Sequence, residues 1–269
     1  MQRFLLALLL SLPALSAAEP IIRDVVFPGA KGKSIPAYLV IPGTRVNGGA
    51  AILFVHWLES RSPDSNRSQF LSQAFDLARD GVTSLLPATL WSDPKWFEQR
   101  DPEQDYDKSL EQVADLGKAL DYLLAQPGVD PNRVAYVGHD FGMMYGLLLS
   151  QTDKRPCAWA LQAGTTAFED WYLLGRRTLS EADKQKVRDR LQPLAPLRFI
   201  GNLDRPVFLQ FGVRDPYVPR ARTEALWNAA REPKKLVYYE AGHGLNEEAI
   251  RDRVAWLREV LGLKRADSD

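Results

Sequence analysis

The sequence predicts an α/β fold with a mainly parallel, doubly wound sheet, a leading antiparallel hairpin and a short lid-like insert. Three observations support this prediction. Two segments rich in β-branched and aromatic residues open the chain on either side of a glycine-containing turn. Short apolar runs then alternate with segments whose apolar residues recur at helical spacing. These runs are uninterrupted, as in strands that are buried on both faces of a parallel sheet. Alternating strands and helices favour a sheet that helices cover on both sides.

The predicted elements follow one another along the chain. The hairpin covers residues 21–27 and 35–41, and the run A-A-I-L-F-V at residues 50–55 is the first buried strand. The next helix stops at Gly81, a residue that commonly ends helices. The remaining elements are helices over residues 70–80, 106–125, 141–151, 222–231 and 247–261, and strands over residues 82–86, 133–137, 157–162, 206–211 and 236–240.

In two stretches, the apolar residues recur at neither helical nor strand spacing. Residues 87–100 carry two tryptophans, and we expect a long loop that forms part of a pocket wall. Residues 165–201 are less regular than their neighbours, and we expect them to form the lid-like insert.

The N-terminus has the pattern of a secretory signal peptide. Arg3 precedes an apolar run at residues 4–12, and small residues follow as far as Ala18. The run is too short to span a bilayer, which takes roughly 20 residues. We therefore expect residues 1–18 to be removed and residues 19–269 to form one domain, periplasmic or secreted, with no membrane contact after processing.

Composition narrows the classes of partner. Lys plus Arg and Asp plus Glu both number 34, so the chain has no basic field to hold nucleic acid. Cys157 is the only cysteine, which excludes an intramolecular disulfide. We expect a small-molecule substrate and neither a cofactor nor a metal, and the sequence does not indicate an oligomeric state.

Four polar segments stand where predicted strands end: His56-Trp57, the stretch G-H-D-F-G at residues 138–142, Asp215 and His243. In open α/β sheets, sites form outside the carboxyl ends of the strands. We therefore expect these segments to meet at one edge of the sheet.

The stretch G-H-D-F-G has the form of a tight strand-to-helix turn. Side chains at Gly138 and Gly142 would collide with neighbouring backbone, while the central Asp140 would be pushed outward. The amides that begin the following helix favour negative charge, so we expect a lowered pKa and an ionised Asp140. An aspartate that only caps the helix is the alternative.

Asp215, in F-G-V-R-D-P-Y-V-P, and His243, in A-G-H-G, complete the order nucleophile, acid, histidine that is typical of the α/β-hydrolase triad. Asp170 is the alternative acid, since it follows the preceding strand. We favour Asp215 because of its turn context.

These motifs resemble those of α/β-hydrolases, in particular dienelactone-hydrolase-like and prolyl-oligopeptidase-like esterases, over nearly the whole mature chain. Those relatives carry Ser or Cys where this chain has Asp140, whereas G-H-D-x-G resembles the elbow of haloalkane dehalogenases and epoxide hydrolases. The resemblance implies an α/β-hydrolase fold with Asp140, His243 and Asp215 as the catalytic triad.

An aspartate that attacked a carboxylic ester would form a high-energy anhydride, whereas attack on an alkyl halide or epoxide gives a stable alkyl ester. His243 would then activate water, and the amides of Trp57 and Phe141 would form the oxyanion hole. Haloalkane dehalogenases usually carry Trp after the nucleophile, but Phe141 has no side-chain donor.

Candidate substrate contacts are therefore His56, which resembles an oxyanion-loop histidine, Trp91 and Tyr172, with Tyr145 a weaker candidate. Two alternatives remain open. One is an ester or lactone hydrolase with Asp140 as the base, and the other is an inactive binding protein on the same fold.

Overall fold

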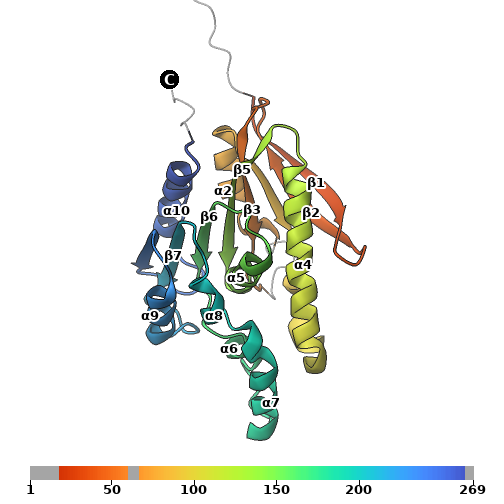
Figure 1. Ribbon diagram of the computed structural model, residues 1–269, viewed down its shortest axis with the longest axis vertical. Coiled ribbons are helices and arrows are strands. Elements are labelled where there is room, and N and C mark those ends of the chain that lie inside the picture. Colours follow the sequence, from red (N-terminus) through yellow and green to blue (C-terminus); the bar gives the residue numbers. More distant parts are fainter. Residues whose placement is uncertain (1–17, 60–66, 264–269) are drawn as a thin grey trace, which may run out of the picture.

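The computed structural model describes residues 18–59 and 67–263, and its centre is one eight-stranded sheet (Figure 1). The strand order is β1-β2-β4-β3-β5-β6-β7-β8. β2 pairs antiparallel with both β1 and β4, and every other pair is parallel. The strands are β1 (Ile21–Pro28), β2 (Ser34–Ile41), β3 (Gly49–Val55), β4 (Thr83–Pro87), β5 (Val129–His139), β6 (Ala158–Gln162), β7 (Val207–Gly212) and β8 (Lys234–Tyr239). The predicted mainly parallel sheet with a leading hairpin is confirmed.

Helices cover both faces of the sheet (Figure 1). The main helices are α2 (Leu71–Arg79), α4 (Asp105–Leu124), α5 (Phe141–Thr152), α9 (Arg220–Ala229) and α10 (Glu247–Val260). A hydrophobic core lies on each face of the sheet, and alternate residues of β3 point into the two cores. Leu53 packs in the cluster that includes α4 and α5, whereas Ile52 packs in the cluster that includes α2 and α10, and both side chains are fully buried. The strands are therefore apolar on both faces, as their uninterrupted runs indicate.

Local signals fix where the helices begin. Asn246 precedes α10, and its side chain accepts a hydrogen bond from the Ala249 amide at 3.0 Å. Glu247 and Glu248 occupy the first turn of α10, where negative charge is favoured.

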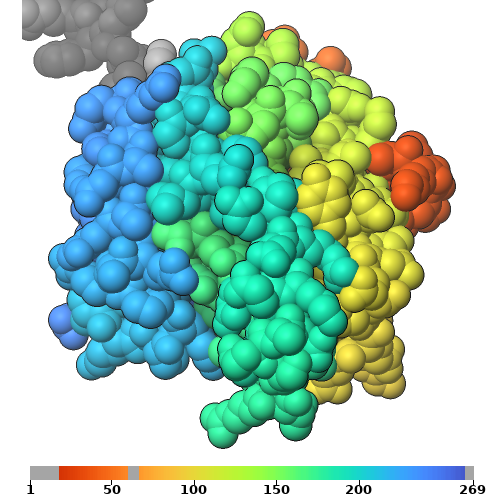
Figure 2. Space-filling model, turned by 60° about the horizontal axis from the view of Figure 1, so that its bottom comes forward, coloured from red at the N-terminus to blue at the C-terminus, as the bar shows by residue number. Residues whose placement is uncertain are grey.

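The insert after β6 is more helical than its sequence pattern indicates. It contains α6 (Glu169–Tyr172), α7 (Glu181–Leu191), η3 (Gln192–Leu194) and α8 (Leu197–Ile200). α7 is polar almost all round, with Val187 and Leu191 as its buried residues, so it has no apolar stripe to recognise. Its first turn is instead capped by Ser180, which accepts from the Asp183 amide. Figure 2 shows the insert (teal) as a ridge across one face, between the yellow and blue parts of the chain.

The predicted loop at residues 87–100 also contains short helices. They are η1 (Leu90–Ser92) and α3 (Trp96–Gln99), and η2 (Pro102–Gln104) follows before α4. The predicted signal peptide, residues 1–18, falls outside the described residues except for Ala18. Within the described ranges, no helix has the length and apolar character needed to cross a membrane.

Candidate active site

Asp140 stands at the turn between β5 and α5, in a backbone conformation that non-glycine residues rarely adopt (φ 57°, ψ −115°). Such a conformation costs about 1–3 kcal/mol and persists only where the surroundings enforce it. The flanking glycines do so by close approach. A Cβ at Gly138 would lie 2.4 Å from the Gly142 carbonyl oxygen, and one at Gly142 would lie 2.1 Å from that of Val55. The predicted reason for both glycines is confirmed.

The two carboxylate oxygens of Asp140 have different surroundings. The Leu58 amide donates a hydrogen bond to Oδ2 at 3.3 Å. Oδ1 has no hydrogen-bond partner within residues 18–59 and 67–263. The side chain lines a pocket, although the residue is only 5% exposed.

Burial raises the pKa of Asp140 to about 6, against the opposing effects of the His243 charge and of the Leu58 amide. The expected lowering of this pKa is therefore wrong in sign. The helix amides do favour the charged form, but loss of hydration outweighs them. Asp140 is still mostly ionised at neutral pH.

His243 lies beside Asp140 in the same pocket and is oriented by Asp215. Its Nδ1 is 2.8 Å from Asp215 Oδ2, while Asp215 Oδ1 accepts the Tyr217 amide at 2.8 Å. Burial alone would lower the pKa of His243, but the hydrogen bond to Asp215 and the charges of Asp140 and Asp215 raise it above its usual value. Asp215, the favoured acid, thus contacts the histidine.

Asp170, the alternative acid, is engaged elsewhere. It accepts hydrogen bonds from the Thr165 hydroxyl at 2.6 Å and the Arg222 guanidinium at 2.8 Å. These contacts account for both of its oxygens and leave Asp215 as the partner of His243.

The predicted oxyanion donors are placed differently from expectation. The Trp57 amide donates to Gln69 Oε1 at 2.9 Å and is therefore not free for a substrate. The next amide along the loop, that of Leu58, reaches Asp140. The Phe141 amide, at the start of α5, also favours the charged form of Asp140 and so opposes the rise of its pKa. Leu58 replaces Trp57 as the candidate second donor, because the loop turns one residue later than the motif alone indicates.

The pocket has a volume of about 560 Å³ and is largely aromatic. Trp171 packs edge-on against His243, with ring centroids 5.4 Å apart, and its Nε1 has no hydrogen-bond partner in the described parts of the chain. The lining residues are Trp57, Leu58, Glu59, Phe97, Asp140, Phe141, Trp171, Leu174, Tyr217, His243 and Gly244. Such a pocket fits a small, mainly apolar molecule.

Two predicted substrate contacts, His56 and Trp91, lie behind the pocket wall instead. His56 is 2% exposed, and its Nδ1 is 2.7 Å from the Trp57 carbonyl oxygen. Burial lowers the pKa of His56 to about 4, so it stays neutral and shapes the loop. The Trp91 indole donates to the His56 carbonyl at 3.0 Å and is fully buried.

Tyr172, the third predicted contact, is also turned away from the pocket. Its hydroxyl is 2.8 Å from that of Tyr145, which in turn is 2.9 Å from the Ser109 hydroxyl, and all three side chains are buried. Trp171, its neighbour on α6, lines the pocket instead. Adjacent residues on a helix point about 100° apart, so one faces the pocket and the other the core.

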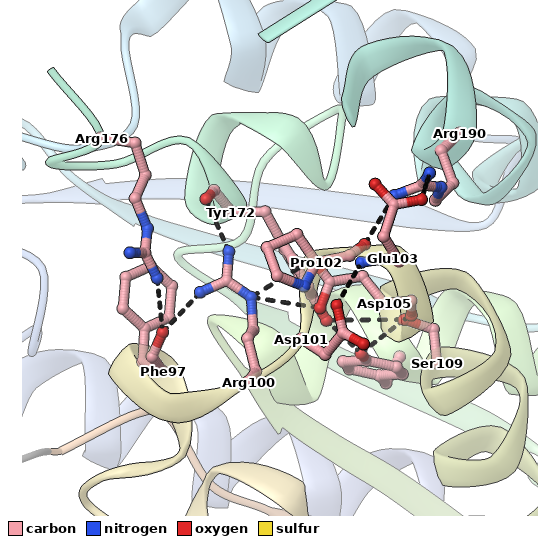
Figure 3. Close-up of polar contacts among 11 residues, drawn as sticks. Phe97, Arg100, Asp101, Pro102, Glu103, Asp105, Ser109, Tyr172, Arg176 and Arg190 are labelled. Carbon is pink, nitrogen blue, oxygen red and sulfur yellow. Dashed lines mark hydrogen bonds and ion pairs between the residues drawn. The ribbon is translucent and has the colours of Figure 1, made fainter. Parts of the chain in front are cut away.

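Arg100 joins two walls of the pocket, as Figure 3 shows. It forms a buried ion pair with Asp105 at 3.2 Å, and both side chains are 5% exposed or less. The same guanidinium donates to the Phe97 carbonyl at 2.5 Å and to the Tyr172 carbonyl at 2.8 Å. Arg176 donates to the Phe97 carbonyl as well, at 2.9 Å. Arg100 therefore links α3, which carries Phe97, to the insert, which carries Tyr172, and we call it the anchor of the pocket.

Three residues of this site escape sequence reasoning: Gln69, Leu58 and Trp171. Gln69 lies in an ordinary polar stretch, and the Leu58 amide carries no side-chain signature. The aromatic cluster F-E-D-W-Y indicates a pocket wall but not which ring faces inward. Within the described ranges, no three His, Cys, Asp or Glu side chains are grouped so as to bind a metal ion.

Comparison with known proteins places this site in a family. Residues 102–264 match the prolyl oligopeptidase family. A polyketide transferase of Stachybotrys chlorohalonatus is 29% identical over 237 residues, which cover 88% of this chain and 72% of that protein.

Solved structures share the fold. A putative dienelactone hydrolase from Klebsiella pneumoniae has a TM-score of 0.67 and 18% identity, over 90% of this chain and 98% of that one. An acetyl xylan esterase from Paenibacillus sp. R4 has a TM-score of 0.71 and 18% identity, over 96% and 88% of the two chains.

Proposed function

This chain belongs to the prolyl oligopeptidase family, within the α/β-hydrolase superfamily, and from that premise we propose that it is an exported hydrolase whose covalent nucleophile is Asp140. Its substrate is a small, mainly apolar molecule with a reactive sp³ carbon, of the alkyl halide or epoxide type. His243 and Asp215 complete the triad.

One observation carries this proposal: the two oxygens of Asp140 are unequal. Oδ2 receives the Leu58 amide, whereas Oδ1 is buried and has no partner in the described chain. A carboxylate that attacks through one oxygen needs donors on the other, because negative charge returns there when the intermediate is hydrolysed. A helix cap would instead use its carboxylate to accept amides of the first turn, and no side-chain capping bond is formed at this helix.

The first step forms a bond between Asp140 Oδ1 and the substrate carbon while the bond to the leaving group breaks. A halide departs as an anion, whereas an epoxide oxygen departs as an alkoxide that must gain a proton. Our candidate hydrogen-bond donor to the leaving group is the indole N–H of Trp171, a pocket-wall residue whose Nε1 is buried and lacks a partner in the described residues. The indole stabilises the alkoxide but is too weak an acid to protonate it, so the proton of the epoxide product comes from water. Phe141 has no such side-chain donor.

The second step hydrolyses the alkyl ester. His243 removes a proton from water, and the hydroxide adds to the Asp140 carboxyl carbon. The oxyanion forms on Oδ2, next to the Leu58 amide. The intermediate collapses as the bond between the carboxyl carbon and the original Oδ1 breaks, and the departing alkoxide takes the proton from the His243 imidazolium to leave as the alcohol. One carboxylate oxygen now comes from water. Asp215 supports the imidazolium through its 2.8 Å contact with Nδ1.

Labelled water tests the proposal. A single turnover in H₂¹⁸O, with a substrate chosen from a panel of haloalkanes, epoxides and aryl esters, should place ¹⁸O in the peptide that contains Asp140 and leave the product unlabelled. Asp140→Ala is the control, and it should neither turn over nor take up label. Label found at once in the product, with an unlabelled enzyme, contradicts a covalent Asp140 intermediate.

The second candidate is a carboxylic ester or lactone hydrolase in which Asp140 acts as a base for water. The structural likeness to a dienelactone hydrolase and an acetyl xylan esterase favours it. The same experiment separates the two, because direct attack by water labels the released acid. Ester turnover that Asp140→Ala abolishes, together with a labelled acid, supports this second candidate.

A further inference from the structure

Gln69 and His139 connect the loop at Trp57 with the loop at His243. The Trp57 amide donates to Gln69 Oε1 at 2.9 Å, Gln69 Nε2 is 2.6 Å from His139 Nδ1, and His139 Nε2 is 2.9 Å from the His243 carbonyl oxygen. His139 immediately precedes Asp140 and is fully buried. This row of three hydrogen bonds is not used by any step of the proposed reaction.

Each atom in the row has one possible role. A main-chain N–H can only donate, so the oxygen of Gln69 faces Trp57 and its NH₂ group faces His139. That NH₂ group can only donate, so His139 Nδ1 is an acceptor. The His243 carbonyl can only accept, so the proton of His139 is on Nε2. The contacts therefore allow a single form of this imidazole, the neutral Nε2–H tautomer.

The surroundings of His139 favour the same form. Burial is the largest effect that lowers its pKa, and the charges of His243 and Arg253 lower it further. Arg253 is itself 2% exposed, and its guanidinium donates to Gln73, Gln162 and Gln210. A proton on Nδ1 would also meet the Gln69 NH₂ group.

We propose that Gln69 and His139 are positioning residues. Gln69 determines which main-chain amide faces Asp140, and His139 fixes the position of the His243 backbone. Gln69 binds the Trp57 amide, so that the Leu58 amide is the one presented to Asp140 Oδ2. His139 supports the backbone of His243, whose ring contacts Asp215. Their kinetic role rests on the function proposed above, whereas the hydrogen-bond row and the tautomer do not.

The three histidines make the tautomer directly observable. In protein labelled with ¹⁵N-histidine, long-range ¹H–¹⁵N spectra distinguish the two neutral tautomers and the imidazolium. We expect His139 to be the single neutral Nε2–H imidazole between pH 6 and 8. His56 should be a neutral Nδ1–H imidazole because it contacts the Trp57 carbonyl, and the pKa of His243 should be higher than that of an ordinary histidine. A wild-type spectrum without a neutral Nε2–H signal would overturn the proposal.

Gln69→Glu tests the function of the row. A carboxylate can still accept the Trp57 amide but cannot donate to His139, so His139 must place a proton on Nδ1. We expect the Nε2–H signature to disappear. On the panel substrate, kcat should fall about 10- to 100-fold, less than the roughly 100- to 1,000-fold that complete loss of an oxyanion donor causes, with KM changed less than about threefold.

Gln112→Glu is the matched control, because Gln112 is also buried and binds the Leu90 amide at 2.7 Å, a hydrogen bond that involves neither His139 nor His243. It should leave the His139 and His243 signals and kcat unchanged, whereas the His56 signal can shift because Thr89, next to Leu90, contacts His56. A Gln69→Glu protein that keeps the neutral Nε2–H tautomer, or keeps the wild-type kcat, contradicts the proposal. Because the spectra need no substrate and the ¹⁸O experiment needs no Gln69 variant, failure of either idea is distinguishable from failure of the other.

Discussion

Asp140→Asn should stabilise the protein in a pH-dependent manner. The side chain is 5% exposed, and burial moves its pKa from 3.8 to about 6. A group whose pKa is higher in the folded state stabilises the fold fully below its unfolded pKa and loses that contribution as pH rises through the folded value. A shift of about 2 pKa units corresponds to about 3 kcal/mol. At pH 8, the ionised Asp140 therefore destabilises the folded state by most of this free energy, and at pH 4 this destabilisation is nearly absent.

The variant keeps the shape of the side chain and an oxygen for the Leu58 amide but carries no charge. The free energy of unfolding of Asp140→Asn should therefore exceed that of the wild type by about 2–3 kcal/mol more at pH 8 than at pH 4. About half of that difference should develop between pH 8 and pH 5. Urea unfolding at intervals of half a pH unit measures it.

Asp140→Ala provides the control for packing. It should show the same pH dependence relative to wild type, with a constant offset for the lost contacts of the side chain. If each variant differs in stability from the wild type by the same amount at pH 4 and at pH 8, the inference that ionisation of Asp140 destabilises the folded protein is refuted.

Three further predictions follow from the site. The rate of formation of the covalent intermediate, measured by stopped flow, should rise with pH through about 6 as Asp140 ionises. Steady-state turnover should instead rise through the higher pKa of His243. Arg100→Met should destabilise the fold by about 3–5 kcal/mol because it leaves the Asp105 carboxyl buried and unpaired, and the double variant with Asp105→Leu should recover part of the loss in urea unfolding. Trp171→Phe keeps an aromatic wall and removes the N–H, so the first step should slow about 10- to 100-fold while substrate affinity changes little, and unchanged single-turnover rates would exclude Trp171 as the donor.

The order of elements could be predicted because each buried strand is short and apolar on both faces. The strand-end argument likewise brought together Asp140, Asp215 and His243, since the carboxyl ends of parallel strands meet at one edge. The glycines of the elbow were predictable because close backbone approach excludes every other residue.

Other features depend on information that a pattern does not hold. Whether the Trp57 or the Leu58 amide faces Asp140 is decided by loop backbone and by Gln69, a residue outside any motif. The sign of the Asp140 pKa shift requires the depth of burial, which local helix amides do not indicate. α7 is held by a cap and surface ion pairs rather than by an apolar stripe, so the period that identifies most helices is missing.

The anchor at Arg100 bears on how this enzyme's substrate range can evolve. Replacing Phe97 or Tyr172 removes a ring on which the same guanidinium stacks, at 4.5 and 4.7 Å from the ring centroids, so such changes alter the fold together with the pocket. Leu174 and Tyr217 line the pocket as well, yet they are 46% and 48% exposed. These two positions are where new specificity is accessible to mutation at the lowest cost in stability.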